Sequence, residues 1–379
     1  MKIALWLLGV SVLLATAPAI YAQETKSVTN APTRRPPPAP PLVSPELQPN
    51  HDVTFRLRAP HATEVKVSGQ FASETKLTKD EHGDWSVTVP TVAPGIYEYH
   101  FIVDELSVMD PQNSAIKPQR WPGSSILQVP ANPPAPWDLQ NVPHGVVHEH
   151  TYQSKALGKW RRVFVYTPPG IATRGRLPVL YLAHGYSDSE GTWTAHGKAH
   201  WILDSLIAAK KAKPMLIVMP DAHALPPGST GFDEYGPANS AAFCRELIED
   251  VIPLIESSYR VLTKPSARAF AGLSMGGHHA LTVALNHHDR FGWVGAFSSA
   301  PPPESTVSAG LDQSNEVNQD LKLLWIAWGK KDFLAQRNET FVALLKSKGI
   351  QYESVETEGD HSWPVWRKYL NEFAPKLFR

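Results

Sequence analysis

The chain has 379 residues, with 36 basic and 36 acidic side chains and 42% hydrophobic residues. That length accommodates two domains, and that hydrophobic content supports ordinary buried cores. Because the formal net charge is zero, the composition favours no polyanionic partner, and we expect no nucleic-acid binding.

The first residues have the pattern of an export signal. Lys2 supplies a positive start, residues 3–15 form a short apolar segment, and small residues suited to cleavage follow. We therefore predict a signal peptide at residues 1–22 and a secreted protein, periplasmic or extracellular. No later apolar run reaches the 18 residues typical of a membrane span, so we expect no membrane contact after the signal is removed.

A proline-rich segment comes next. Eight prolines lie between Pro32 and Pro49. Such a composition cannot build a core and favours extended, semi-rigid geometry. The sequence therefore predicts a linker at residues 23–50.

Residues 51–132 are predicted to form an all-β domain. Apolar and polar residues alternate in short runs such as Val53–Arg58 and Tyr97–Val103, and turn signals such as Ala93-Pro94-Gly95 separate the runs. About seven such strands in this length are typical of an immunoglobulin-like sandwich. A second linker is predicted at residues 133–143.

The aromatic residues of this domain raise the question of carbohydrate binding, because an aromatic face stacks on the apolar face of a sugar ring. Trp85, Tyr97 and Tyr99 lie at alternating strand positions, which favours the core. Trp121 is therefore the candidate carbohydrate-binding residue. A structural role, in which the domain packs on the rest of the protein and shapes its cleft, stays open beside the binding role.

Residues 144–379 form the second predicted domain, which begins with several histidines. His148 and His150 would share one face of a strand, with His144 nearby. Spacing fixes no third ligand, and the chemistry indicated by the later motifs needs no metal. We predict no metal site and no cofactor.

The most specific motif is Gly272-Leu273-Ser274-Met275-Gly276, which follows the apolar run Ala269–Ala271. This arrangement is typical of a nucleophile elbow, in which a strand ends in a tight turn, exposes a serine hydroxyl and enters a helix. A side chain at 272 or 276 would collide with the neighbouring strand or helix, which explains both glycines. The alternative is a surface Gly-Ser loop, and the motifs that follow decide between the two.

A serine becomes a good nucleophile only when a base removes its proton and an acid orients that base. Asp332 follows a predicted buried strand, and His361 follows the last predicted strand. Hydrolases with this elbow have the chain order serine, acid, histidine. We therefore assign Ser274, Asp332 and His361 as a catalytic triad. Asp360 is the competing acid, but a residue adjacent to the histidine points its side chain elsewhere.

The transition state also needs N–H donors for the oxygen that becomes negative. The backbone N–H of Met275, next to the serine, supplies one donor, and the loop after an earlier strand supplies the other. Residues 179–183 are that strand, so Tyr186 is assigned as the second donor. His184, at the end of the strand, is interpreted as structural.

The second domain resembles carbohydrate esterase family 1 over about residues 143–379. The segments that carry the resemblance are Val179–Gly185, Trp193, Ile202–Ile207, Pro214–Asp221, Phe243–Tyr259, Gly272–Gly277, Gly329–Asp332 and Gly359–Trp363. Members include feruloyl and acetyl xylan esterases, among them the feruloyl esterase module of xylanase Z. The resemblance implies an α/β-hydrolase fold, an α/β sandwich with a mostly parallel sheet.

The first domain resembles the early-set domain of glycogen-branching enzymes, which is grouped with carbohydrate-binding module family 48. The resemblance is carried by Phe55–Pro60, Asp84-Trp85, Gly95–Tyr99 and Asp110-Pro111. One departure is Asp104-Glu105, where that family usually has Asp-Gly. This departure alters a hairpin turn.

The resemblance and the motifs together predict a secreted serine esterase that hydrolyses feruloyl or acetyl esters on plant cell-wall xylan through an acyl-enzyme. A planar phenolic acyl group would stack on aromatic residues of the cleft. The candidates for this role are Trp193, Phe232, Tyr235 and Trp363. Two alternatives remain: a periplasmic siderophore or aryl esterase with the same triad, and a carbohydrate-binding protein with an inactive hydrolase domain.

Overall fold

The computed structural model describes residues 41–173, 175–226 and 232–379. The predicted signal peptide and most of the predicted first linker lie outside these residues. No helix among the described residues is long and apolar enough to span a membrane.

The first domain is a β-sandwich, as predicted. One sheet has the order β1-β2-β6-β5, and the other has the order β4-β3-β7-β8, with β9 also paired to β7. The strands are β1 (Glu46–Leu47), β2 (Val53–Arg58), β3 (Val65–Gly69), β4 (Ala72–Lys76), β5 (Thr78–Lys79), β6 (Asp84–Val89), β7 (Gly95–Val103), β8 (Leu106–Val108) and β9 (Ser125–Val129).

The alternation in the sequence has the predicted effect on this domain. Val53, Phe55 and Leu57 of β2 point inward and are buried, while the residues between them are more exposed. Trp85 and Tyr99 are buried in the same core. Because these aromatic rings are enclosed, they are core residues rather than a sugar-binding surface.

The sandwich begins earlier in the chain than the predicted boundary at residue 51. Strand β1 lies inside the range 23–50, and Glu46 pairs with Thr54 of β2. Ser44 is buried, and its hydroxyl donates a hydrogen bond of 2.6 Å to the carboxylate of Asp110. The last residues of the proline-rich range are therefore part of the domain, because a buried hydrogen bond and a strand pairing hold them there.

Asp104 and Glu105, which stand where the family usually has Asp-Gly, form the hairpin turn between β7 and β8. Both residues have positive φ angles, 45° and 74°, which the turn requires and which side chains seldom adopt. The Asp104 carboxylate accepts hydrogen bonds of 2.9 Å from the backbone N–H groups of Thr63 and Glu64. These bonds help to hold a turn that glycine would otherwise allow.

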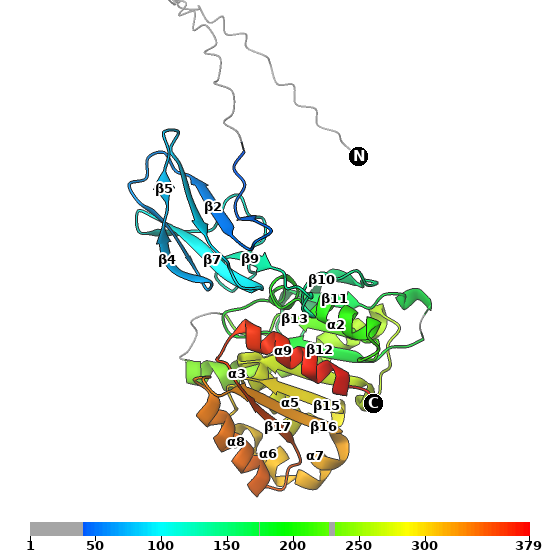
Figure 1. Ribbon diagram of the computed structural model, residues 1–379. Coiled ribbons are helices and arrows are strands. Elements are labelled where there is room, and N and C mark those ends of the chain that lie inside the picture. Colours follow the sequence, from blue (N-terminus) through cyan, green and yellow to red (C-terminus); the bar gives the residue numbers. More distant parts are fainter. Residues whose placement is uncertain (1–40, 174, 227–231) are drawn as a thin grey trace, which may run out of the picture. The chain divides into compact units, whose positions relative to one another are not determined.

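The second domain is an α/β-hydrolase fold with an eight-stranded sheet (Figure 1). The strand order is β10-β11-β13-β12-β14-β15-β16-β17, parallel from β13 to β17 and antiparallel at β10 and β11. The strands are β10 (Val146–Ser154), β11 (Lys159–Thr167), β12 (Val179–Ala183), β13 (Leu216–Pro220), β14 (Arg268–Leu273), β15 (Trp293–Phe297), β16 (Leu323–Gly329) and β17 (Glu353–Thr357).

Helices cover both faces of this sheet. The α-helices are α1 (Thr192–Ala195), α2 (Ala199–Ala208), α3 (Phe232–Glu246), α4 (Ile252–Ser258), α5 (Met275–Asn286), α6 (Glu304–Asp312), α7 (Ser314–Asp320), α8 (Ala335–Ser347) and α9 (Trp363–Phe373). A π-helical turn, Leu247–Val251, joins α3 to α4, and 3₁₀ turns lie at Ile171–Thr173, Pro265–Ala267, His288–Arg290 and Ala374–Lys376.

Strand β12 shows how the two cores arise. Its five residues are all buried, and they face alternately the core under α2 and α9 and the core under α3, α5 and α8. A strand buried on both faces has a continuous apolar run, which is the pattern in the sequence.

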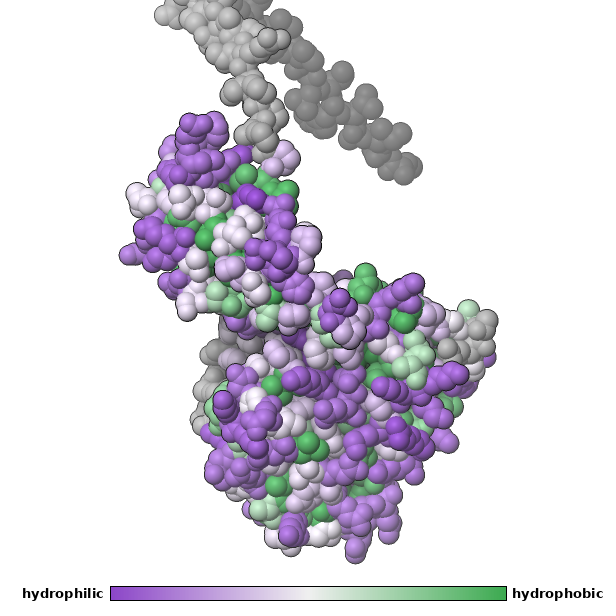
Figure 2. Space-filling model, in the orientation of Figure 1, coloured by the Kyte–Doolittle hydropathy of each residue, from purple (hydrophilic) through white to green (hydrophobic). Residues whose placement is uncertain are grey.

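The outer surface seen in Figure 2 is mostly hydrophilic, with apolar residues scattered among polar ones.

Candidate active site

Ser274 lies in the tight turn between β14 and α5. Its φ angle is 53°, in a region that a residue with a side chain adopts only when its surroundings enforce it. A Cβ atom at Gly272 would lie 2.4 Å from the backbone carbon of Gly276, and one at Gly276 would lie 2.6 Å from the Ala183 oxygen. Both glycines are therefore required by close backbone approach, as the motif predicts.

The structure brings the three predicted triad residues together. His361 Nε2 lies 3.0 Å from Ser274 Oγ, and His361 Nδ1 lies 3.0 Å from each carboxylate oxygen of Asp332. The competing acid Asp360 instead accepts a hydrogen bond from the hydroxyl of Ser362. The geometry therefore selects Asp332 as the partner of the imidazole.

The surroundings of Asp332 favour its charged form. Burial raises the pKa of this carboxyl, but hydrogen bonds from His361 and from the Leu334 backbone N–H outweigh burial and hold the pKa below its usual value. A carboxylate that stays ionised beside Nδ1 can orient the imidazole and stabilise its protonated form.

The two predicted oxyanion residues lie beside Ser274. Met275 is the first residue of α5, where backbone N–H groups have no partner within the helix. Gly185 lies over the elbow, since a Cβ atom there would be 2.7 Å from Leu273 Cδ1 and 3.6 Å from Ser274 Cβ. Tyr186 follows directly and lines the same cavity as Ser274.

His184 is placed as a structural residue. It is buried, its Nδ1 lies 2.8 Å from the Gly185 oxygen, and its Nε2 accepts a 2.9 Å hydrogen bond from the Ala222 N–H. Both ring nitrogens are therefore engaged by backbone groups.

The cavity that contains Ser274 and His361 has a volume of about 480 Å³ and is built from both domains, so we call it the two-domain cavity. The first domain contributes Gln70, Glu98, Lys117 and Gln119. The second contributes Gly185, Tyr186, Ser187, Asp188, Leu273, Ser274, Phe333, Leu334, His361, Ser362, Trp363 and Trp366. No local signal in the sequence marks the four residues of the first domain, because only tertiary packing brings them to the serine.

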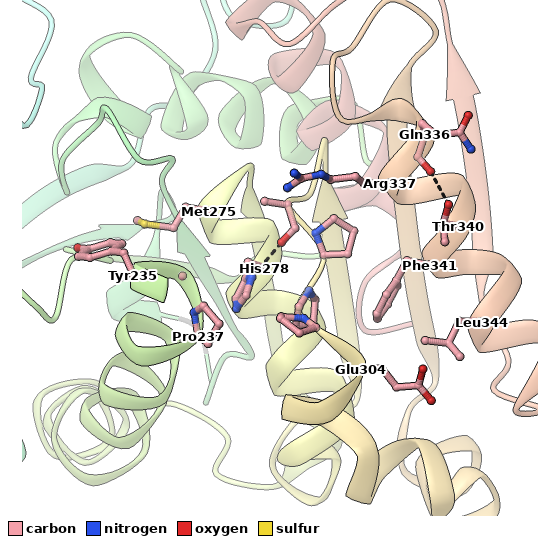
Figure 3. Close-up of a pocket in the computed structure, with 15 residues that line it drawn as sticks. Tyr235, Pro237, Met275, His278, Glu304, Gln336, Arg337, Thr340, Phe341 and Leu344 are labelled. Carbon is pink, nitrogen blue, oxygen red and sulfur yellow. Dashed lines mark hydrogen bonds between the residues drawn. The ribbon is translucent and has the colours of Figure 1, made fainter. Parts of the chain in front are cut away.

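A second cavity, of about 630 Å³, adjoins Met275 (Figure 3). Most of its lining is apolar, and we call it the apolar cavity: Tyr235, Gly236, Pro237, Met275, His278, Ala300, Pro301, Pro302, Pro303, Glu304, Gln336, Arg337, Thr340, Phe341 and Leu344. Tyr235 and Met275 lie on one side of it in Figure 3, and Phe341 and Leu344 of α8 lie on the other.

His278 contributes an uncharged surface to the apolar cavity. Burial lowers the pKa of its imidazole to about 4. Its Nδ1 lies 2.9 Å from the Ala300 oxygen, the bond drawn in Figure 3. His278 is therefore uncharged near neutral pH, and the charged side chains that line this cavity are those of Glu304 and Arg337.

The aromatic residues predicted to stack on the acyl group differ in their burial and in the cavity that they line. Trp193 is only 1% exposed, and its Nε1 donates a 3.0 Å hydrogen bond to the Ala183 oxygen, so its predicted stacking role is wrong. Trp363 is 4% exposed and packs edge-on against Trp193, while part of it borders the two-domain cavity. Tyr235 is buried and lines the apolar cavity. The side chain of Phe232 lies outside the described part of the structure.

Two exposed aromatic residues flank the two-domain cavity. Trp121, the predicted carbohydrate-binding residue, is 60% exposed, and its ring centre is 6.5 Å from that of Tyr186. Phe333 is 76% exposed, and its ring centre is 4.4 Å from that of His361. Sequence reasoning missed Phe333, although its position directly after Asp332 was a signal.

The histidines at the start of the second domain make separate contacts. His150 Nε2 is 2.5 Å from the Tyr259 hydroxyl, His148 Nε2 is 3.1 Å from Thr167 Oγ1, and His144 Nδ1 is 2.9 Å from the Asp204 carboxylate. Among the residues that the structure describes, no group of three His, Cys, Asp or Glu side chains is placed to hold a metal ion.

Comparison with known families identifies both domains. Residues 154–377 match the family described as "Putative esterase", and residues 43–118 match carbohydrate-binding module 48, the isoamylase N-terminal domain. An endo-1,4-beta-xylanase/feruloyl esterase of Xylanibacter ruminicola is 31% identical over 338 residues, which cover 86% of this chain and 44% of that protein. The chain thus spans less than half the length of this relative.

Solved structures show the same likeness. A CE1 ferulic acid esterase of Anaeromyces mucronatus in complex with ferulic acid is 27% identical with a TM-score of 0.56, over 64% of this chain and 93% of that one. The enterobactin esterase of Shigella flexneri is 20% identical with a TM-score of 0.60, over 86% of this chain and 92% of that one, a likeness of fold alone. Both resemblances predicted from the motifs are confirmed.

Proposed function

The chain belongs to the esterase family, and from that premise we propose that it is a serine esterase that releases feruloyl groups from plant cell-wall xylan. The observation that carries the proposal is the continuous hydrogen-bonded series from Ser274 through His361 to Asp332. The feruloyl esterase relatives support the choice of acyl group.

The proposed mechanism begins with attack of Ser274 Oγ on the ester carbonyl carbon. His361 Nε2 takes the serine proton, and Asp332 stabilises the imidazolium that forms. The backbone N–H groups of Met275 and Tyr186 bind the oxyanion of the tetrahedral intermediate. His361 then gives the proton to the leaving sugar alkoxide, and water, activated by the same imidazole, hydrolyses the acyl-enzyme.

The protonation step also determines which half of the ester lies in which cavity. The alkoxide must leave from the side where His361 can protonate it, and His361 lines the two-domain cavity. The sugar half of the ester is therefore assigned to that cavity, where Gln70, Glu98 and Gln119 offer polar groups. The acyl half is assigned to the apolar cavity next to Met275, which suits a phenolic ring.

Export belongs to the same proposal. Xylan is an extracellular polymer, and the first 22 residues have the charge and apolar pattern of a signal peptide. Secretion is tested by expression of the full chain in a bacterial host and determination of the N-terminus of the protein recovered outside the cytoplasm.

A substrate panel tests the proposed activity. Methyl ferulate, acetylated xylan and a short-chain nitrophenyl ester are compared on one preparation, with enterobactin as the fourth substrate. We expect the highest kcat/KM on the feruloyl ester. Cleavage of enterobactin without action on feruloyl esters or acetylated xylan would favour the siderophore esterase, whose fold resembles both domains of this chain.

The same preparation distinguishes an enzyme from a binding protein with an inactive hydrolase domain. A fluorophosphonate probe should label Ser274 covalently, and S274A should not be labelled. An unlabelled wild-type protein would refute the proposed mechanism.

A further inference from the structure

A short segment of the first domain runs along the loop that carries Tyr186. We call residues 117–121 the strap and residues 184–188 the oxyanion loop. Gln119 of the strap forms an antiparallel bridge with Asp188, and the Arg120 N–H donates a 2.9 Å hydrogen bond to the Ser187 oxygen. The backbone of the first domain is therefore bonded directly to the loop beside the serine.

A buried cluster of charges fixes one end of this contact. Lys117 Nζ lies 2.9 Å from Glu98 Oε1 and 3.3 Å from Asp188 Oδ1, and the side chains of these residues are only 5%, 17% and 2% exposed. Removal of one partner from such a cluster leaves an uncompensated buried charge, which is strongly unfavourable. The far end of the oxyanion loop is thus tied to the first domain.

Arg120 occupies the other end, among aromatic rings. Its guanidinium carbon lies 5.0 Å from the ring centre of Tyr186, 5.2 Å from that of Tyr235 and 5.1 Å from that of Trp121. Its Nη2 donates a 3.3 Å hydrogen bond to the Tyr235 hydroxyl. A cation enclosed by ring faces is attracted by each of them.

The charge of Arg120 has no carboxylate partner among the described residues, and its Nη1 is buried without a hydrogen bond. Apart from the neighbouring Trp121, its guanidinium contacts two tyrosines of the second domain, Tyr186 and Tyr235.

Each of those two tyrosines lines one of the cavities, and the two rings pack against each other, so we call the pair the partition. The rings of Tyr186 and Tyr235 meet edge to face, with centres 5.6 Å apart and an angle of 88°. Tyr186 lines the two-domain cavity, and Tyr235 lines the apolar cavity. Arg120 contacts both rings, so it holds the partition and, through Tyr186, the oxyanion loop.

We propose that Arg120 is a positioning residue of the esterase: supplied by the first domain, it holds the Tyr186 backbone N–H in place for the oxyanion. The inference rests on the proposed serine-esterase mechanism. Because an oxyanion donor must lie within hydrogen-bond reach of the developing charge, a small shift of the loop costs turnover more than ground-state binding.

The test compares R120M and R120K with wild type in the full chain. The matched control is R58M, since Arg58 lies in the same domain and pairs with Asp84 at the surface. We measure kcat and KM on methyl ferulate, the affinity of phenylboronic acid, which forms a tetrahedral adduct with the serine, the affinity of ferulate, and the Tm.

For R120M we expect kcat to fall about 30-fold, less than the 100-fold or more for complete loss of one oxyanion donor. KM and ferulate affinity should stay within about 3-fold, while boronate affinity falls with kcat. R120K should recover part of the loss, because it keeps the cation but not the planar group. R58M should match wild type in every measurement.

Two results would overturn the positioning role. One is an R120M protein with wild-type kcat and boronate affinity, and the other is a rise in KM with kcat unchanged, which would make Arg120 a substrate contact. If R120M does not fold, R120K with wild-type kcat and boronate affinity would refute the role equally. A wild-type protein that hydrolyses no ester refutes the proposed function itself, whereas an active wild type with an equally active R120M refutes this inference alone.

Discussion

The two cavities beside Ser274 differ in composition and in the part of the chain that builds them. The two-domain cavity combines His361 with polar residues of the first domain, such as Glu98 and Gln119. The apolar cavity belongs to the second domain alone and is walled by three consecutive prolines, Pro301–Pro303, and by Phe341. With the substrate oriented as proposed, the first domain lines only the side of the leaving alcohol, and on the acyl side it acts through the contact of Arg120 with Tyr235.

Loss of a triad residue should abolish turnover of every ester, whatever lies in the two cavities, because one nucleophile serves all of them. We expect S274A to lower kcat by about 10⁶-fold and D332N by about 10⁴-fold, since the triad acts as a unit and the carboxylate orients the imidazole. Turnover of methyl ferulate under saturating substrate measures both effects.

D360N is the matched control for D332N. Asp360 is bonded to Ser362 rather than to the imidazole, so D360N should keep nearly all activity. A large loss in D360N with an active D332N would show that Asp360 is the catalytic acid and that the geometry described above does not operate in turnover.

A larger side chain in the apolar cavity should lower activity on a feruloyl ester but not on an acetyl ester. Leu344 lies on α8 at the cavity wall, and L344W places a larger ring there. We expect kcat/KM for methyl ferulate to fall about 10-fold, near the lower end of the discrimination that steric misfit in a hydrophobic pocket gives. Activity on a short acetyl ester should stay within about 2-fold, because acetyl does not reach the filled part.

A tryptophan elsewhere on the same helix controls for the effect of the mutation on α8. Ala343 is exposed and is not part of the cavity lining, so A343W should leave both esters unaffected. Equal losses on the two esters in L344W would contradict the assignment of the acyl half to this cavity.

The sequence predicted the triad because each member directly follows a strand in a fixed chain order. Ser274 follows β14, while Asp332 and His361 follow β16 and β17 within a few residues. These signals are local in the sequence, so they can be recognised without knowledge of the tertiary packing. The predicted stacking role of Trp193 was wrong because it depended on tertiary packing. Whether an aromatic residue after a strand is exposed depends on what packs over it, and here Trp363 does.

The contribution of the first domain was beyond sequence reasoning. The bridge between Gln119 and Asp188 joins segments almost seventy positions apart in different domains, and neither segment carries a recognisable motif. Of the two roles left open for the domain, its contacts favour the one in which it shapes the cleft. Trp121 lies beside that cleft, so sugar contact and cleft shaping are compatible at one place.

The smallest expected effect concerns the sugar side. Gln119 lines the two-domain cavity, and its side-chain amide makes no hydrogen bond to another described residue, so it is available to a sugar hydroxyl. One such bond contributes about 1 kcal/mol net, which predicts that Q119A raises KM about 5-fold for a feruloylated xylo-oligosaccharide. Methyl ferulate has no sugar, and its KM should stay unchanged in Q119A. The bridge between the strap and Asp188 is formed by backbone atoms, so Q119A should keep the strap in place. A Tm equal to that of the wild type would show that it does. A loss shared equally by both esters would mean that Gln119 supports the strap rather than contacting the sugar, and the alcohol half would then have to be placed elsewhere in the cavity.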